Sequence, residues 1–390
     1  MAFDGAQFLR NPIRFDRMDT MTPGILDAPA AKAPETGRLG GATVVVQADA
    51  TADLLDSMEE LSMQFEEKSA KKLSERKLGD ARMRSSAYVE ALEKWMKAMP
   101  DMPGKDEMDR LLRQLRQMAA DGRGADAAGL KGMLAKLSGD PSHQFAMLDI
   151  LDSALQAGDE ELGKLVDTVR SELVKEKGGE IRAGINLASE VNARSTTPEE
   201  MSDLRNLYRS EILGFKSPQD CFRSLLASRG AGGLDGAIEF LFKGCGVDLT
   251  SAMPSRDAVE LRRIMLDLQC VQVLKTVLGM MDQLGARMAK EFGVNMLLGS
   301  EAMTSRIADF TEKPFVTGSQ IGAFVSECAV MKLLAQMDFT RELMNVFRKL
   351  SPRLFAAEED RQKLVDSTQE HLDSLIAEEI DADEGKEDSP

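Results

Sequence analysis

Residues 254–292 form the longest uninterrupted helical pattern in the chain, and they constrain the fold more than any other stretch. Apolar side chains recur there every three or four residues, which keeps one face of a single helix apolar throughout. Ser255 is a suitable N-cap, Asp257 lies where a helix start favours negative charge, and no proline follows until Pro314. A helix of this length would extend roughly 55 Å, more than the width of one small domain. We therefore predict one continuous helix shared by two helical domains, the alternative being two helices with a break near Gly279.

Composition favours helices and argues against several functions. Of the 390 residues, 5% are aromatic and 24 are Met, which is typical of helical bundles rather than sheets. The net charge of −16 argues against binding to nucleic acid or to an anionic membrane surface. The sequence has no run of eighteen apolar residues and no apolar signal-peptide core at its start, so we expect no membrane insertion and synthesis in the cytosol.

The residues that usually carry chemistry are sparse. The four cysteines are far apart and form no CxxC pair, so we expect free, buried thiols at Cys221, Cys245, Cys270 and Cys328. The two histidines, His143 and His371, are interpreted as ordinary surface or boundary residues. The glycine cluster at residues 229–236 lacks the third glycine of GxGxxG and is interpreted as a flexible helix connection. We therefore predict no catalytic residue, no metal site, no cofactor and no enzymatic activity.

The first 79 residues differ from the rest. Residues 1–40 contain scattered proline, glycine and alanine and are predicted to be disordered. Residues 41–51 contain the chain's one convincing strand pattern, and residues 53–78 follow as a helix whose first half is amphipathic. A lone strand is either a sticky linker or a strand added to a partner's sheet. The candidate partner-binding side chains of this segment are Val44, Val45, Val46, Leu54, Leu55, Met58, Leu61 and Phe65.

The rest of the chain predicts an all-α fold of three consecutive helical bundles of about four helices each. The first bundle covers residues 80–157, and the second covers 158–272. The third covers 273–378 and shares the long helix with the second; an acidic tail follows at 379–390. Within these bundles, Thr197-Pro198 and Ser217-Pro218 each read as a cap followed by a first-turn proline. Residues 321–334 are predicted to form one helix of the third bundle.

Four stretches of the chain resemble the type III secretion gatekeeper family, the YopN–TyeA, InvE and MxiC type. They are GDPSHQFAML at 139–148, EIRAGINLASEVNA at 180–193, LRNLYRSEILGFKSPQDCFRSLL at 204–226, and residues 337–376. The last is similar to TyeA, which some members carry as a separate chain. The resemblance covers roughly residues 50–378. It implies an elongated rod of three bundles that restrains effector export until the cell is triggered and favours earlier export of translocators.

The resemblance also implies partners and locations. Residues 1–40 would be an uncleaved type III export signal, and residues 41–79 would bind a secretion chaperone, usually a heterodimer. Further expected partners are the export-apparatus gate and translocator–chaperone complexes. The protein would act in the bacterial cytoplasm at the base of the apparatus and be secreted, or associate with the outer membrane, after triggering. The alternative is a helical adaptor or scaffold protein without a secretion role.

Overall fold

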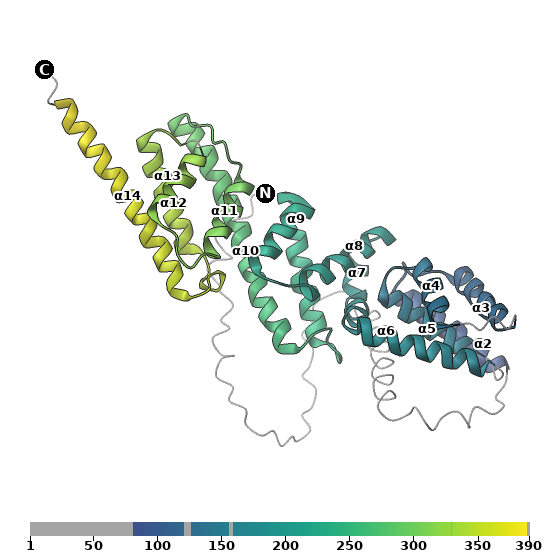
Figure 1. The fold of residues 1–390 in the computed structure, drawn as a ribbon. Helices are drawn as coiled ribbons and strands as arrows, with labels where there is room; N and C mark the ends of the chain where they lie inside the picture. The colour runs from purple at the N-terminus through teal and green to yellow at the C-terminus, as the bar shows by residue number, and fades with distance from the viewer. Residues whose placement is uncertain (1–80, 121–125, 156–158, 329, 388–390) are drawn as a thin grey trace, which may run out of the picture. The chain divides into compact units, whose positions relative to one another are not determined.

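The computed structural model describes residues 81–120, 126–155, 159–328 and 330–387, and the side chains of 86–380 within them. These residues form helices joined by short connections and contain no strand (Figure 1). The predicted all-α class is confirmed. The strand expected at residues 41–51 lies outside the described residues.

Five helices build a first core. They are α2 (Ala81–Ala98), α3 (Lys105–Ala120), α4 (Ala127–Leu137), α5 (Pro141–Ala154) and α6 (Glu160–Asn186). Asp126 caps α4 by accepting a hydrogen bond from the backbone N–H of Gly129, and Asp140 caps α5 ahead of Pro141. Trp95 lies in the centre of this core, edge-on to Phe145 with ring centroids 6.1 Å apart. Because α6 also contributes Leu162 and Val166, the first core continues past residue 157.

The middle of the chain begins with the end of α6, which bends at Lys177, and continues through α7 (Ala188–Arg194) and α8 (Pro198–Tyr208). Thr197 forms the predicted cap of α8 as a full capping box with Glu200. A π-helical turn, η2 (Arg209–Leu213), precedes α9 (Pro218–Thr250), whose cap is Ser217 as predicted. Helix α9 bends at Gly230, where φ is +65°, so the glycine cluster is a kink between two helical segments.

The predicted long helix is present. Helix α10 (Ala258–Arg287) continues directly into the π-helical turn η3 (Met288–Phe292), with no break at Gly279. The predicted N-cap was wrong: Asp257 caps the helix by accepting from the N–H groups of Val259 and Glu260. Ser255 instead is buried and donates to Asp248 through its backbone N–H and its hydroxyl.

The C-terminal part contains α11 (Ser300–Thr311), α12 (Gly318–Glu327), α13 (Leu333–Lys349), a short 3-10 turn η4 (Pro352–Leu354) and α14 (Glu358–Glu387). The single helix predicted for residues 321–334 was wrong, because α12 ends at Glu327 and α13 begins at Leu333. Lys332, the residue before α13, extends its ammonium group to the backbone oxygen of Phe292 at the end of η3. Lys332 therefore ties the start of α13 to the end of the long helix.

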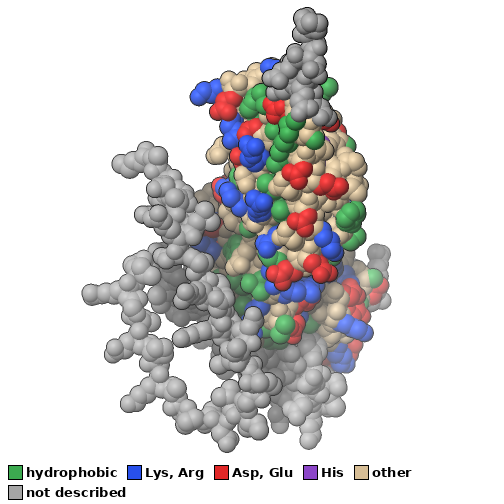
Figure 2. Space-filling model, turned by 90° about the vertical axis from the view of Figure 1, so that its left-hand side faces the viewer, with side chains coloured by type: hydrophobic (Ala, Val, Ile, Leu, Met, Phe, Trp, Pro, Cys, Tyr) green, Lys and Arg blue, Asp and Glu red, His purple; other side chains and the backbone are tan. Residues whose placement is uncertain are grey.

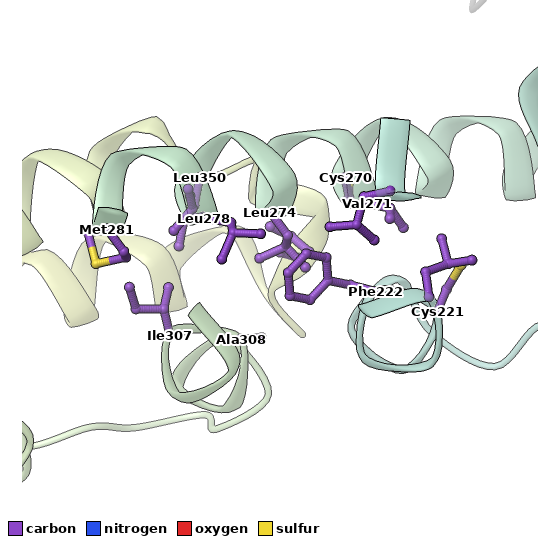
Figure 3. Close-up of a cluster of buried hydrophobic side chains, with 14 of the residues drawn as sticks. Cys221, Phe222, Cys270, Val271, Leu274, Leu278, Met281, Ile307, Ala308 and Leu350 are labelled. Atoms are coloured by element: carbon purple, nitrogen blue, oxygen red, sulfur yellow. The ribbon is translucent and has the colours of Figure 1, made fainter. Parts of the chain in front are cut away.

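A second core extends from the end of α6 to α14 as one continuous cluster of buried side chains. Helix α10 runs through it, and Figure 3 shows Phe222 of α9 and Ile307 of α11 both directed at this helix. The buried side chains of the described residues thus divide into two clusters, with no interruption between the expected second and third bundles. The three-bundle arrangement, its rod shape and its boundaries stay predictions.

Helix α10 with η3 is, by length and composition alone, apolar enough to cross a membrane, although it contains no run of eighteen apolar residues. Core helices meet the same criterion. Here ten side chains of α10 are buried, all of them in the second core.

The four cysteines are free and buried, as predicted. Burial raises the pKa of the Cys245 and Cys328 thiols to about 12. These side chains therefore pack as small apolar groups and remain protonated thiols at neutral pH.

Candidate functional site

The side chains predicted to bind a chaperone, Val44–Val46 and Leu54, Leu55, Met58, Leu61 and Phe65, lie outside the described residues. They stay a prediction. Among the described residues, no group of histidine, cysteine, aspartate and glutamate side chains is arranged to hold a metal ion. The candidate sites that the structure does describe are two junctions between helices and one groove of mixed lining.

The first junction joins the middle of the chain to its C-terminal part along α10. Figure 3 shows Phe222 of α9 beside Leu274, and Ile307 of α11 below Leu278 and Met281. All five side chains are buried. The two helices therefore use neighbouring parts of one apolar helix face, which holds them together through the hydrophobic effect.

Polar contacts at this junction fix how α9 and α11 fit together. The side-chain amide of Gln219 is buried and donates to Thr311 Oγ1 at 2.9 Å and to the backbone oxygen of Leu354 at 2.7 Å. Arg223, one turn further along α9, pairs with Asp309 at 2.9 Å and Glu312 at 2.7 Å. Gln219 links three segments inside the junction, while the partly exposed Arg223 pairs link them at its edge.

The second junction is a buried cluster of charged side chains between the first core and α8. Asp101 follows α2, Asp140 caps α5 and His143 lies in the first turn of α5. Arg205 of α8 donates to Asp101 and, at 3.0 Å, to Asp140, and Arg209 of η2 donates to Asp140 at 2.5 Å. Arg205 is 1% exposed. Two carboxylates thus face two guanidinium groups, of which Arg205 is buried and Arg209 is partly exposed.

The predicted surface or boundary position of His143 was wrong, because this side chain is 4% exposed. Its Nε2 lies 3.1 Å from an Arg205 nitrogen that can only donate, so Nε2 accepts and Nδ1 donates to Ser138 Oγ at 3.0 Å. Burial and the charge of Arg209 lower the pKa of His143, against the opposing effect of Asp140. A neutral imidazole leaves the charges of the two carboxylates and two guanidiniums balanced.

The charge states of Asp140 and Arg205 are consistent with a neutral His143. Burial alone would raise the pKa of Asp140, but the charge of Arg209 and the hydrogen bonds from Arg209 and Ser142 lower it overall. Burial lowers the pKa of Arg205 to about 10, which still leaves its guanidinium charged at neutral pH.

The sequence contained one signal for this cluster, which our prediction from apolar periodicity did not take into account. Arg205 follows Met201 by four residues and precedes Tyr208 by three, and both of those side chains are buried. A charged residue on the apolar face of a helix requires a buried partner of opposite charge. His371 lies at a boundary position as predicted, since it is half-buried with its ring against Gly322.

A groove of about 340 Å³ lies between the end of α10 and the loop before α11. Its lining is mixed: it includes the small residues Gly285, Ala286 and Ala289, the apolar Met296 and Leu298, and the polar Asp282, Asn295 and Ser300. Nearby connections expose Leu297 and Met331, which are 78% and 76% exposed.

Two family models match the chain. The HrpJ-like domain matches residues 58–229, and TyeA matches residues 301–381. The first match thus includes the charge cluster and the start of α9, and the second begins in α11. Residues 230–300, which contain α10, lie between them.

Known proteins with similar sequence or fold agree with these matches. The outer membrane protein YopN of Yersinia enterocolitica is 27% identical over 245 residues, which are 62% of this chain and 82% of YopN. MxiC of Shigella flexneri shares the fold with a TM-score of 0.54 and 18% identity over 73% of this chain and 99% of MxiC. CopN of Chlamydia pneumoniae has a TM-score of 0.53 and 17% identity over 74% of this chain and 99% of CopN. A chain from a CopN–Scc3 complex has a TM-score of 0.50 and 18% identity over 72% of this chain and 98% of the matched chain.

An HrpJ-like region followed by a TyeA domain, on this helical fold, defines a regulator of type III secretion. The chain belongs to the type III secretion gatekeeper family and has a TyeA-like C-terminal domain.

Proposed function

We propose that the chain restrains effector export by occupying the export apparatus, and that its own secretion ends the restraint. The observation that carries this proposal is the junction on α10, which holds the HrpJ-like region and the TyeA-like domain together in one chain. Bound in this way, both regions would arrive at the apparatus together and leave it together. Members of the family act as secretion regulators rather than enzymes, and we propose the same for this chain.

The binding surfaces would be polar. Figure 2 shows acidic and basic side chains interspersed over the visible part of the described surface, so the excess negative charge is not gathered into one patch there. Contacts with the export gate and with translocator–chaperone complexes would therefore combine several small charged areas.

The segment at residues 41–79 would bind a secretion chaperone, with Val44–Val46 adding a strand and Leu54 to Phe65 supplying an apolar helix face. The CopN–Scc3 complex, in which a protein of this fold is bound to another protein, supports partner binding in general. Residues 1–40 would serve as the export signal. The protein would then move from the cytoplasmic base of the apparatus to the outside of the cell.

A secretion assay tests the regulatory role. Deleting the gene should release effectors before triggering and abolish the order of translocators before effectors, and the full-length chain should restore both. If the deletion strain exports effectors at the normal time and still exports translocators first, the proposal is wrong and the adaptor role is favoured. Fusing residues 1–40 to a reporter separates the same two readings, because an adaptor would not direct type III export.

A pull-down tests the chaperone segment. Deleting residues 41–65 should abolish co-purification of the chaperone while the far-ultraviolet circular dichroism of the helices is retained. Deleting residues 66–79, the charge-rich continuation, is the matched control and should leave co-purification intact. Chaperone binding by the 41–65 deletion would contradict the assignment.

A further inference from the structure

We propose that the buried charge cluster formed by Asp101, Asp140, His143, Arg205 and Arg209 is a latch that makes the two cores unfold as one unit. If the chain is an export substrate, as the proposed function has it, its two latched cores would unfold together during export. This consequence rests on the proposed function. The latch itself is a property of the described fold and is tested without secretion.

The members of the cluster are divided between the two cores. Asp101 lies between Met99 and Met102, and Asp140 and His143 begin α5; these neighbours belong to the first core. Arg205 lies between Met201 and Tyr208, which belong to the second core. Every charge-assisted hydrogen bond that joins two members of the cluster therefore crosses from one core to the other.

The distribution of charge is the second argument. The first core contributes the two carboxylates, and the α8–η2 segment contributes the two guanidinium groups. Each half alone places like charges next to each other, whereas the assembled cluster is neutral. Removing one member leaves a buried charge without its partner, which is far more destabilising than losing an exposed ion pair. The cluster is therefore stable only when both halves are in place.

The scarcity of apolar continuity is the third argument. The buried hydrophobic side chains of the two cores form separate clusters that share no residue, although α6 and α7 each contribute to both. Besides these two helices, a hydrogen bond from Asn192 to the backbone oxygen of Ala98, at 2.8 Å, also crosses. Because the two cores do not merge into one apolar cluster, their coupling depends on the polar junction.

The chain provides a natural probe for this coupling. Trp95 is its one tryptophan, it is fully buried in the first core, and its indole N–H donates to Asp149 at 2.8 Å. Its fluorescence reports unfolding of the first core, whereas far-ultraviolet circular dichroism reports helices of both cores. Arg205 belongs to the second core, so an effect of its replacement on Trp95 measures coupling.

The experiment is urea unfolding of the full chain followed by both signals. In the wild type the two transitions should coincide. In Arg205→Met the Trp95 transition should separate from the main dichroism transition and move down by about 1 M urea or more. Arg205→Lys keeps the positive charge but lacks the planar guanidinium that donates to two carboxylates, so it should give a smaller separation of the two transitions. This variant provides a second test if Arg205→Met does not fold.

Arg229→Met is the matched control, because Arg229 pairs with Asp203 at 2.6 Å near the surface of the same region. It should leave both transitions coincident. Separate transitions in the wild type would overturn the proposal. So would an unchanged Trp95 transition in both Arg205 variants, which would mean that the cluster only stabilises α8 locally.

Discussion

Gln219 and Thr311 are joined by a hydrogen bond of 2.9 Å although they are 92 positions apart in the sequence. The same amide group reaches the backbone oxygen of Leu354, so one side chain of α9 connects two segments of the TyeA-like region. The HrpJ-like match ends ten residues after Gln219, at residue 229. This hydrogen-bonded pair therefore connects the regions that the two family models recognise.

Replacing Gln219 with Leu should lower the free energy of unfolding by about 1–3 kcal/mol, because the buried Leu354 oxygen and Thr311 hydroxyl lose a partner. Urea unfolding followed by circular dichroism measures this. The control is Gln272→Leu at an exposed position on α10, which should change stability by less than about 0.5 kcal/mol. Equal effects of the two replacements would show that Gln219 contributes nothing specific to the junction.

Replacing Arg223 with Ala should have a smaller effect, about 0.2–1 kcal/mol, because its ion pairs with Asp309 and Glu312 are partly exposed and screened by salt. The difference from the wild type should shrink further in 1 M salt. A loss as large as that of Gln219→Leu, unchanged by salt, would contradict this ranking of the two contacts.

Replacing Gly184 with Ala should destabilise the chain, by about 1–3 kcal/mol if it behaves like other overpacked sites. A Cβ at this position would lie 2.6 Å from Cβ of the buried Ser142, which is too close for either helix to remain in place. Gly279→Ala is the opposite case: nothing lies within 4 Å of the added carbon, and the position is an exposed helix interior. It should stabilise the chain by about 0.5–1 kcal/mol. Thermal unfolding of both variants measures the two signs, and loss of stability in both would contradict the argument.

Acidification should destabilise the first core. The folded-state pKa of His143 is lowered, so its contribution to stability is complete above the unfolded value of 6.5 and decreases as the pH falls below it. The decrease has a limit of about 1.4 kcal/mol per pH unit for one group. The lowered pKa of Asp140 acts in the same direction, but only as the pH falls below its ordinary value of 3.8. Asp101, Arg205 and Arg209 are the other charged groups that face His143 in the cluster.

The measurement is urea unfolding between pH 7.5 and 5, with Trp95 fluorescence as the signal. His143→Gln keeps a hydrogen-bond acceptor for Arg205 and should reduce the pH dependence. Burial also lowers the pKa of His371, so His371→Gln is the control that accounts for the second histidine. A pH dependence that persists unchanged in His143→Gln would show that this histidine is not responsible.

The periodicity of apolar side chains predicted the parts of the fold that depend on local pattern. The long helix from Ala258 to Phe292, the capping box at Thr197 and the cap at Ser217 all follow from residues close to one another in sequence. The errors occurred where a residue on another helix decides. Ser255 has the character of a cap, but Asp248 near the end of α9 binds it, and Asp257 therefore caps the helix.

The local sequence pattern could not predict the buried charge cluster, because its members come from different parts of the chain. Asp140 caps α5, and its carboxylate also binds Arg205 and Arg209, which lie more than sixty positions away. A sequence pattern identifies a cap from the next few residues and gives no information about the second partner. The break between α12 and α13 is similar, because Lys332 and its contact with Phe292 belong to the way the helices pack together.

The apolar face of α10 has a consequence for how such a chain can be encoded. Helices α9 and α11 adhere to this face through their own side chains, and the loop at residues 293–299 merely connects α10 to α11. If translation stopped in that loop and restarted after it, both polypeptides would retain the surfaces needed to find each other. Covalent linkage then chiefly raises the effective concentration of one piece near the other, so one gene or two can specify the same assembly.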